Sequence, residues 1–330
     1  MKLKQFSLLL AIAITINVSH AQLKKQKNTS FKVGQLWYDT EGNLINAHGG
    51  TILYFKHIYY WFGEKRGDHQ SQGITVYTSK DLYNWQYKGV VFEQSKDATS
   101  PIAEGGIMER PKVIYNKKTK KFVLWFHLEI RGRGYNAAEV GVAESNHILG
   151  PYKYVRSFRP NGNMSRDMTI YKDDDGKAYE IYSSRDNYDM RIVQLTDDYL
   201  NVTKKDSLLF SKHREAPAIF KYNHQYYLIT SACTGWAPNE AALCVANNLY
   251  GPWKMLGNPM KGEKSKTTFD GQPAFILPLP NKKNCFIYVG DKWNPKDLMD
   301  SRYQFLPIKI TAGGVAIPWE ENWSLNIFDK

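Results

Sequence analysis

Residues 215–231 read EAPAIFKYNHQYYLITS, which is a short run of small and apolar residues, a polar turn and a second run rich in tyrosine. Two such runs joined by a polar turn are typical of a β-hairpin. Four other segments have the same layout, and each opens on a polar residue. They are HGGTILYFKHIYYWFGE at 48–64, ERPKVIYNKKTKKFVLWFH at 109–127, DMTIYKDDDGKAYEIYS at 167–183 and QPAFILPLPNKKNCFIYVGD at 272–291.

The five hairpins open at intervals of 48 to 61 residues. A repeat of this size built from strands indicates a β-propeller or a similar array. In a propeller the innermost strand of each blade begins near the central axis, so the opening residues would form a ring at one mouth of the channel. These residues are His48, Glu109, Asp167, Glu215 and Gln272.

Polar turns after the first four hairpins mark a third and a fourth strand in each repeat. They lie at 78–85, 144–152, 196–200 and 246–253, and the strand-like run 303–323 would complete the last repeat. No long stretch keeps a 3.6-residue apolar period, so long helices are not expected. The sequence therefore predicts an all-β protein that folds as a five-bladed β-propeller.

Composition narrows the class of protein further. The chain has 330 residues, of which 42% are hydrophobic and 14% aromatic, and this suits one large domain. The formal net charge is +12, but the lysines are scattered over turns without a basic helix, so nucleic-acid binding is not expected. The three cysteines lack zinc-ligand spacing, and neither a metal nor a cofactor is expected.

The N-terminal segment has the pattern of a secretory signal peptide. Lys2 and Lys4 precede an apolar stretch that ends at Val18, and small residues precede Gln22. The apolar stretch is too short for a comfortable membrane span. We expect a periplasmic or secreted monomer without a membrane span. The expected divisions are a signal peptide at 1–21, a leader at 22–35 and the propeller at 36–330.

Three carboxylates, an imidazole and an amide around one channel mouth indicate acid–base chemistry. Cleavage of a glycosidic bond needs a carboxylic acid that protonates the leaving oxygen and a second group that activates water on the opposite face. A glutamate that stays protonated near neutral pH needs burial or a nearby negative charge. Asp167 on the adjacent blade would supply that charge to Glu215. The alternative is that both side chains only cap strand ends.

An Asp before a DDDGKAY hairpin at 173–179, followed by a Glu that heads EAPAIFK at 215–221, resembles glycoside hydrolase family 43. The resemblance runs from about Leu36 to the C-terminus. It implies a five-bladed β-propeller and inverting hydrolysis. It also implies that Glu215 is the general acid and that Asp167 tunes the pKa of Glu215 and orients it.

The catalytic base that most members of this family carry in the first blade is missing, because the chain reads NAHGG where Ala-Asp-Pro is usual. One branch, the exo-β-1,3-galactanases and their close relatives, is similar in the segments AHGG (47–50), ERPKVIYN (109–116) and SRDM (165–168), and in a Gln at the fifth blade. This resemblance implies that Gln272 holds the attacking water and that Glu109 contacts the sugar or the water. A neutral amide is a poor base, so the chemistry alone favours Glu109, and both remain candidates.

Further substrate-binding residues are expected at strand ends and loops on the same side of the propeller. They would bind sugar hydroxyls or stack on a sugar ring. A packed aromatic or a solvated charge is the competing interpretation for each, and a core histidine is favoured for His48. The candidates are Glu64, Tyr135, Thr234, Trp236, Asn239, Trp293 and His48.

Three functions fit these residues. The first is an exported exo-acting hydrolase that releases terminal galactose from β-1,3-galactan or arabinogalactan. The second is an α-L-arabinofuranosidase or a β-D-galactofuranosidase on the same scaffold, because segments 182–184 and 233–239 also resemble members of that specificity. The third is a propeller that binds a polysaccharide or oligosaccharide without cleaving it. The retained Glu215 and Asp167 argue against the third function, since a lectin does not need a tuned acid.

Overall fold

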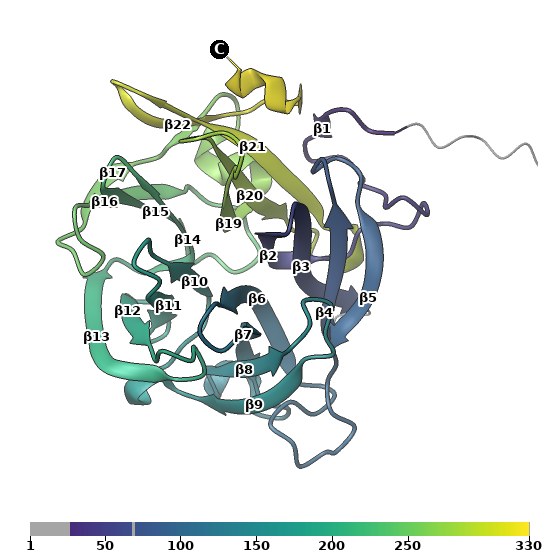
Figure 1. The fold of residues 1–330 in the computed structure, drawn as a ribbon. Coiled ribbons are helices and arrows are strands. Elements are labelled where there is room, and N and C mark those ends of the chain that lie inside the picture. The colour runs from purple at the N-terminus through teal and green to yellow at the C-terminus, as the bar shows by residue number, and fades with distance from the viewer. Residues whose placement is uncertain (1–26, 68–69, 330) are drawn as a thin grey trace, which may run out of the picture.

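The computed structural model describes residues 27–67 and 70–329, and the signal-like segment 1–21 lies outside these residues. The described residues form five sheets arranged around one axis (Figure 1). The prediction of an all-β, five-bladed propeller is confirmed. No helix in the described ranges is long and apolar enough to cross a membrane.

Each of the first four blades is a four-stranded antiparallel sheet whose strands follow one another in chain order. Polar turns between apolar runs produce this meander, as the sequence predicts. The strands are β2 (His48–Phe55), β3 (Ile58–Gly67), β4 (Gln70–Ser79) and β5 (Gln86–Phe92) in blade one, β6 (Ile107–Asn116), β7 (Lys121–Glu129), β8 (Glu139–Ser145) and β9 (Lys153–Phe158) in blade two, β10 (Met168–Lys172), β11 (Ala178–Ser184), β12 (Asp189–Leu195) and β13 (Val202–Ser211) in blade three, and β14 (Arg214–Tyr222), β15 (Gln225–Ala232), β16 (Ala242–Ala246) and β17 (Lys254–Gly257) in blade four.

The fifth blade is built from the C-terminal part of the chain, and the run 303–323 supplies strands to it as expected. A short strand, β18, pairs in parallel with the outer strand β22. The first strands of neighbouring blades contact one another in a closed ring, from β2 through β6, β10, β14 and β19 back to β2 (Figure 1). The strands of this blade are β18 (Met260–Lys261), β19 (Gln272–Pro278), β20 (Phe286–Lys292), β21 (Arg302–Thr311) and β22 (Gly314–Pro318).

The two ends of the described chain are joined by a small separate sheet. Strand β1 (Phe31–Lys32) pairs with β23 (Asn322–Trp323), and the ring of Phe31 lies 4.5 Å from that of Trp323. Phe31 and Val33 are buried in the core. Packing of the propeller therefore begins before residue 36, where the sequence placed the boundary, because these apolar side chains close the ring.

Both faces of each blade pack against a neighbouring blade, which explains why the strands read as continuous apolar runs. Strand β7, for example, is buried along almost its whole length. Large aromatic residues such as Trp61 and Trp125 fill the wedges between blades and are 1% and 0% exposed. Within residues 27–67 and 70–329, helical structure is limited to short 3₁₀ turns. These are η1 (Gly134–Asn136), η2 (Pro160–Gly162), η3 (Ser265–Asp270), η4 (Leu298–Asp300) and η5 (Leu325–Phe328).

Candidate active site

An irregular step follows the opening residues of four innermost strands. The register with the second strand shifts after His48, Glu109, Glu215 and Pro273. A bulge of this kind bends the strand and re-aims a side chain. In three blades the residue after the opener also has a left-handed backbone, which costs of order 1–3 kcal/mol for a non-glycine residue. These residues are Gly49 (φ 57°), Arg110 (φ 53°) and Ala216 (φ 52°).

A pocket lies where the innermost strands begin, and all five blades contribute to its wall. The structure brings the four candidate catalytic residues together there with four of the seven candidate binding residues. Five further polar side chains of the wall were not singled out from the sequence. The expected residues that line the pocket are Glu109, Asp167, Glu215, Gln272, Glu64, Tyr135, Trp236 and Trp293, and the additional ones are Arg66, Arg110, His127, Arg166 and Asn187.

Glu215 has two amide donors, one on each carboxyl oxygen. Gln272 Nε2 donates to Oε1 at 2.9 Å, and Asn187 Nδ2 donates to Oε2 at 3.0 Å. Burial raises the pKa of Glu215 to about 7, and the charge of Asp167 acts in the same direction, whereas the Arg110 cation opposes both. A carboxyl that titrates near neutral pH is suited to general acid catalysis. The sequence analysis gave burial or the charge of Asp167 as possible causes, and burial is the larger cause.

Arg110 joins three blades around the pocket through its buried guanidinium. Nε and Nη2 donate to the two oxygens of Asp167 at 3.1 and 2.8 Å, and Nη2 also donates to Gln272 Oε1 at 2.5 Å. Nη1 donates to the carbonyl oxygen of Pro273 at 2.8 Å. A bidentate pair of this kind is strong and fixes orientation. Arg110 therefore sets the positions of Asp167 and Gln272 relative to Glu215.

The amide of Gln272 uses all of its hydrogen-bonding positions. Oε1 accepts from Arg110 and from Trp293 Nε1 at 3.0 Å, while Nε2 donates to Glu215 and to Ser231 Oγ at 3.1 Å. Inverting hydrolysis predicts that the acid and the group that holds the water lie roughly 6.5–9.5 Å apart. For Gln272 that expectation is wrong in this structure, since its amide touches the carboxyl of Glu215.

Glu109 accepts three hydrogen bonds. Arg66 Nη2 and the hydroxyl of Tyr135 donate to Oε1 at 3.0 and 3.1 Å, and His127 Nδ1 lies 3.2 Å from Oε2. Burial alone would raise the pKa of Glu109, but the hydrogen bond from His127 and the charge of Arg66 hold that pKa well below its usual range. Glu109 is therefore a carboxylate wherever Glu215 titrates. Two carboxyls with pKa values pushed apart in one pocket are typical of an acid and its ionised partner.

His127 lies between Glu109 and a second buried carboxylate. Its Nε2 is 2.9 Å from Glu129 Oε1, and the other oxygen of Glu129 accepts the N–H of Ala138 at 2.9 Å. Burial alone would lower the pKa of His127, but the hydrogen bonds with Glu109 and Glu129 raise that pKa to about 9. His127 is therefore a cation near neutral pH and compensates the charge of its two neighbours.

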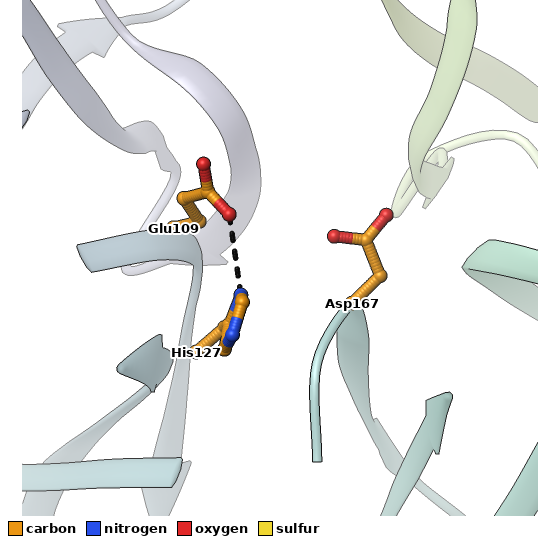
Figure 2. Close-up of side chains that lie close together, drawn as sticks. All are labelled: Glu109, His127 and Asp167. Atoms are coloured by element: carbon orange, nitrogen blue, oxygen red, sulfur yellow. Dashed lines mark hydrogen bonds and ion pairs between the residues drawn. The ribbon is translucent and has the colours of Figure 1, made fainter. Parts of the chain in front are cut away.

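Glu109, His127 and Asp167 present possible metal-ligand atoms within 4.8 Å of one another. In Figure 2 the ring of His127 points at Glu109, and Asp167 faces them from the opposite side. A metal ion would need a neutral imidazole and available carboxylates. Here His127 is charged, Arg66 bonds Glu109 and Arg110 bonds Asp167. The grouping fits a charge-compensated acid–base site better than a metal site.

His48 does not line the pocket, so its expected place among the substrate-binding residues is corrected. Its side chain is fully buried, its ring stacks on Tyr303 at 5.1 Å, and its Nδ1 lies 3.3 Å from Asp291 Oδ1. The following glycines are set by packing, because a Cβ on Gly50 would lie 1.9 Å from the carbonyl oxygen of Phe62. The AHGG segment is therefore part of the propeller core.

Glu64 lies deep in the pocket wall, opposite His48 in the strand register. Its Oε1 is 3.0 Å from Arg66 Nε. Burial raises the pKa of Glu64 to about 8, although the Arg66 cation opposes the shift. A carboxyl with this pKa can donate a hydrogen bond as well as accept one, which suits contact with a hydroxyl-rich ligand.

Two tryptophans form the wall above blades four and five. Trp236 is 47% exposed and meets Trp293 edge to face, with ring centroids 5.7 Å apart. Asn239 and Thr234 do not line this pocket. The amide of Asn239 bonds both backbone groups of Ala232 and the Thr234 hydroxyl, so the two residues shape the loop that carries Trp236. Asn239 also lines a neighbouring pocket beside the same tryptophans.

The sequence profile of glycosyl hydrolases family 43 matches residues 46–294. The chain belongs to glycoside hydrolase family 43. It is therefore a glycoside hydrolase, and the resemblance inferred from its motifs is confirmed. No protein with a curated function matches the chain.

Solved family 43 structures share the fold along most of the chain. A β-1,3-galactosidase solved with galactodeoxynojirimycin is 44% identical, with a TM-score of 0.88 over 89% of this chain and 100% of that chain. An exo-β-1,3-galactanase from Phanerochaete chrysosporium, solved with β-1,3-galactotriose, is 38% identical, with a TM-score of 0.84 over 90% and 69%. An exo-β-1,3-galactanase from Clostridium thermocellum is 36% identical, with a TM-score of 0.81 over 89% and 66%.

The family 43 site also contains residues that a closer reading of the hairpins could have found. A residue near the end of the second strand pairs with the opener, and this register places His127 opposite Glu109 and Ser231 opposite Glu215. Arg110 immediately follows an opener in the ERPKVIYN segment. Asn187 carries no such signal, because it lies in a turn whose direction the local sequence does not determine.

Replacing Asp167 by asparagine is expected to move the basic limb of the pH–kcat/KM profile to lower pH. The change removes a charge that raises the pKa of Glu215 and leaves the opposing Arg110 cation without its partner, so Glu215 should ionise at lower pH. Asp175→Asn, in an exposed hairpin turn at the other end of blade three, is the matched control. An unchanged basic limb in a folded Asp167→Asn protein would contradict the coupling.

Proposed function

We propose that this protein is an exo-acting, inverting glycoside hydrolase that releases terminal galactose from β-1,3-galactan or arabinogalactan. The observation that carries the proposal is the pair of carboxyls in one pocket, Glu215 with a pKa raised to about 7 and Glu109 with a pKa held well below its usual range. The sugar is inferred from the relatives, whose names give β-1,3-galactosidase and exo-β-1,3-galactanase activities.

The shape of the pocket supports action at a chain end. All five blades contribute to its wall, and Trp236 and Trp293 stand on one side of it. A site enclosed in this way accepts one terminal residue more readily than the middle of a polymer. The exposed ring of Trp236 offers a stacking surface for a sugar.

In the proposed mechanism, Glu215 protonates the leaving oxygen while a water attacks the opposite face of the sugar. Gln272 holds that water with help from Glu109, and Asp167 keeps Glu215 protonated at neutral pH. The contact between Gln272 and Glu215 must break in the productive complex, because an inverting site needs space for the sugar and the water. Arg110 would then keep the Gln272 amide in place from its other side.

Product analysis tests this function. Incubation with β-1,3-galactan should release free galactose, and proton NMR of fresh product should show the α-anomer before mutarotation, because attack inverts a β-linkage. Aryl α-L-arabinofuranosides and aryl β-D-galactofuranosides should be poor substrates in parallel assays. If arabinose or galactofuranose is released faster than galactose, the proposed substrate is wrong and the faster one takes its place. If the first product is β-galactose, the enzyme does not invert the anomeric configuration.

We also propose that the protein is exported and acts as a monomer. The support for export is the signal-like pattern of residues 1–21. A polysaccharide of the cell exterior would be accessible to such a protein. Cell fractionation and light scattering would check the two statements separately.

A further inference from the structure

The hydrogen bonds of Glu215 pose a chemical problem for a general acid. Both of its oxygens face N–H donors, Gln272 on Oε1 and Asn187 on Oε2. Donors of this kind favour the ionised carboxylate over the protonated acid. A carboxyl that must carry a proton needs a nearby acceptor for its O–H group. A change in the orientation of one of the two amides would provide that acceptor inside the protein when Glu215 is protonated.

Gln272 cannot turn its amide around. Its Oε1 accepts from Arg110 Nη2 and from Trp293 Nε1, and both of these groups can only donate. A rotated amide would place its NH₂ group against two donors, and both of these hydrogen bonds would be lost. In the free enzyme Glu215 Oε1 therefore faces a donor in either protonation state, and the proton belongs on Oε2 before the substrate separates Glu215 from Gln272.

Asn187 is free to turn in the way that Gln272 is not. Its Nδ2 donates to Glu215 Oε2, while its Oδ1 is buried and has no hydrogen-bond partner within the part of the chain that the structure describes. The terminal torsion of asparagine is broad and nearly twofold. A half-turn of the amide would give up no bond on Oδ1 and would place that oxygen where it accepts the O–H of Glu215.

The backbone that carries Asn187 is held while its amide turns. Arg185, Asp186 and Asn187 all have left-handed φ angles, of 46°, 54° and 67°. Such strain persists only where the surroundings fix it, and it gathers at functional sites. Arg185 bonds both oxygens of Asp189 at 2.9 and 2.8 Å, and Asp186 accepts from Arg166 at 2.8 Å. The turn is thus tied to the blade at both ends.

We propose that Asn187 is a positioning residue whose amide turns with the protonation state of Glu215. It donates to Oε2 when Glu215 is ionised and accepts from the O–H when Glu215 is protonated, so the transferable proton is kept on Oε2. In the catalytic step the proton leaves Oε2 for the glycosidic oxygen as the bond from that oxygen to the anomeric carbon breaks. The attacking water bonds the anomeric carbon from the opposite face and gives its proton to the base, Glu109 or Gln272, and the Asn187 amide turns back to stabilise the new carboxylate of Glu215. This inference rests on the proposed role of Glu215 as the general acid.

Two substitutions at residue 187 test the inference. Asn187→Gly removes the amide without adding strain, because glycine accepts a positive φ. Asn187→Asp keeps the shape but can only accept, and aspartate also tolerates this backbone region. Asn223→Gly is the matched control, since Asn223 has a φ of 46° in an exposed turn at the opposite end of blade four.

The readouts are kcat and its pH dependence on β-1,3-galactobiose and on 2,4-dinitrophenyl β-galactoside, whose leaving group needs little protonation. Asn187→Gly should lower kcat on galactobiose by about 10- to 100-fold, the loss expected for one hydrogen bond to a charged group, with a much smaller loss on the aryl substrate. Asn187→Asp should retain more activity on galactobiose than Asn187→Gly. Its basic limb should move to higher pH, because the added charge raises the pKa of Glu215.

The inference is wrong if Asn187→Asp is no more active than Asn187→Gly on galactobiose, or if both substrates lose equally. An effect confined to KM would also contradict it, since that result indicates simple sugar binding. The groups that face Glu215, namely Asp167, Glu109, Arg110 and the Cys233 thiol, are unchanged in every variant. If Glu215→Gln is inactive on galactobiose while the Asn187 variants behave as wild type, only this inference fails and the proposed function stands.

Discussion

Replacing Glu215 by glutamine should lower kcat on a β-1,3-linked galactooligosaccharide by about 10²–10⁴-fold, the usual contribution of general acid catalysis. Glutamine keeps the size of the side chain but cannot give a proton to the leaving oxygen. The pKa of Glu215 lies near 7 while its neighbour Glu109 remains ionised, so Glu109 is not suited to replace it as the acid. The loss should therefore appear mainly in kcat.

A comparison of substrates with different leaving groups separates the loss of acid catalysis from a general loss of activity. A dinitrophenyl galactoside departs with little protonation, so Glu215→Gln should keep far more of its activity on that substrate than on galactobiose. Glu320→Gln, at an outer edge of the propeller where Glu320 pairs with Lys309, is the control. Thermal unfolding of all variants would show whether the fold is intact. Full activity of Glu215→Gln on galactan would remove Glu215 from the role of acid.

The second large effect is expected at the water-holding groups, where Gln272→Ala and Glu109→Ala should each be severely impaired. Loss of the Gln272 side chain leaves Arg110 and Trp293 without their shared acceptor and frees Glu215 from its Oε1 donor. Loss of Glu109 leaves the buried cations Arg66 and His127 without a common partner. Removal of one partner of a buried charge pair lowers the free energy of unfolding by about 3–5 kcal/mol, because the other charge is left buried without compensation.

Azide distinguishes the two residues, because a small anion can attack the anomeric carbon where a missing base once activated water. We expect added azide to restore part of the activity of whichever variant lacks the base, with a galactosyl azide of inverted configuration as the product. The variant that azide does not restore acts through sugar binding or electrostatics. Near-normal activity of Gln272→Ala would contradict the proposed role of Gln272. Near-normal activity of Glu109→Ala would mean that Gln272 holds the attacking water without help from Glu109.

The sequence located the catalytic candidates because a propeller converts a one-dimensional repeat into a ring. Glu109, Asp167, Glu215 and Gln272 are far apart in the chain, yet each lies within two residues of the start of an innermost strand and all four line one pocket. That result needs only the hairpin pattern and the rule that equivalent strands begin at the same mouth. The same rule misplaced His48, since the bulge after it and the close approach of Gly50 to β3 bury its ring.

What the sequence by itself determined is therefore the number of blades, the family and the residue types at the ring, because these depend on local patterns that repeat. Tertiary structure alone decided how the charges are arranged. Arg110 reaches from blade two to Asp167 on blade three and Gln272 on blade five, and Asn187 reaches Glu215 from a turn of blade three. The pKa of Glu215 depends on burial and on these distances, and both arise only when separate blades pack together.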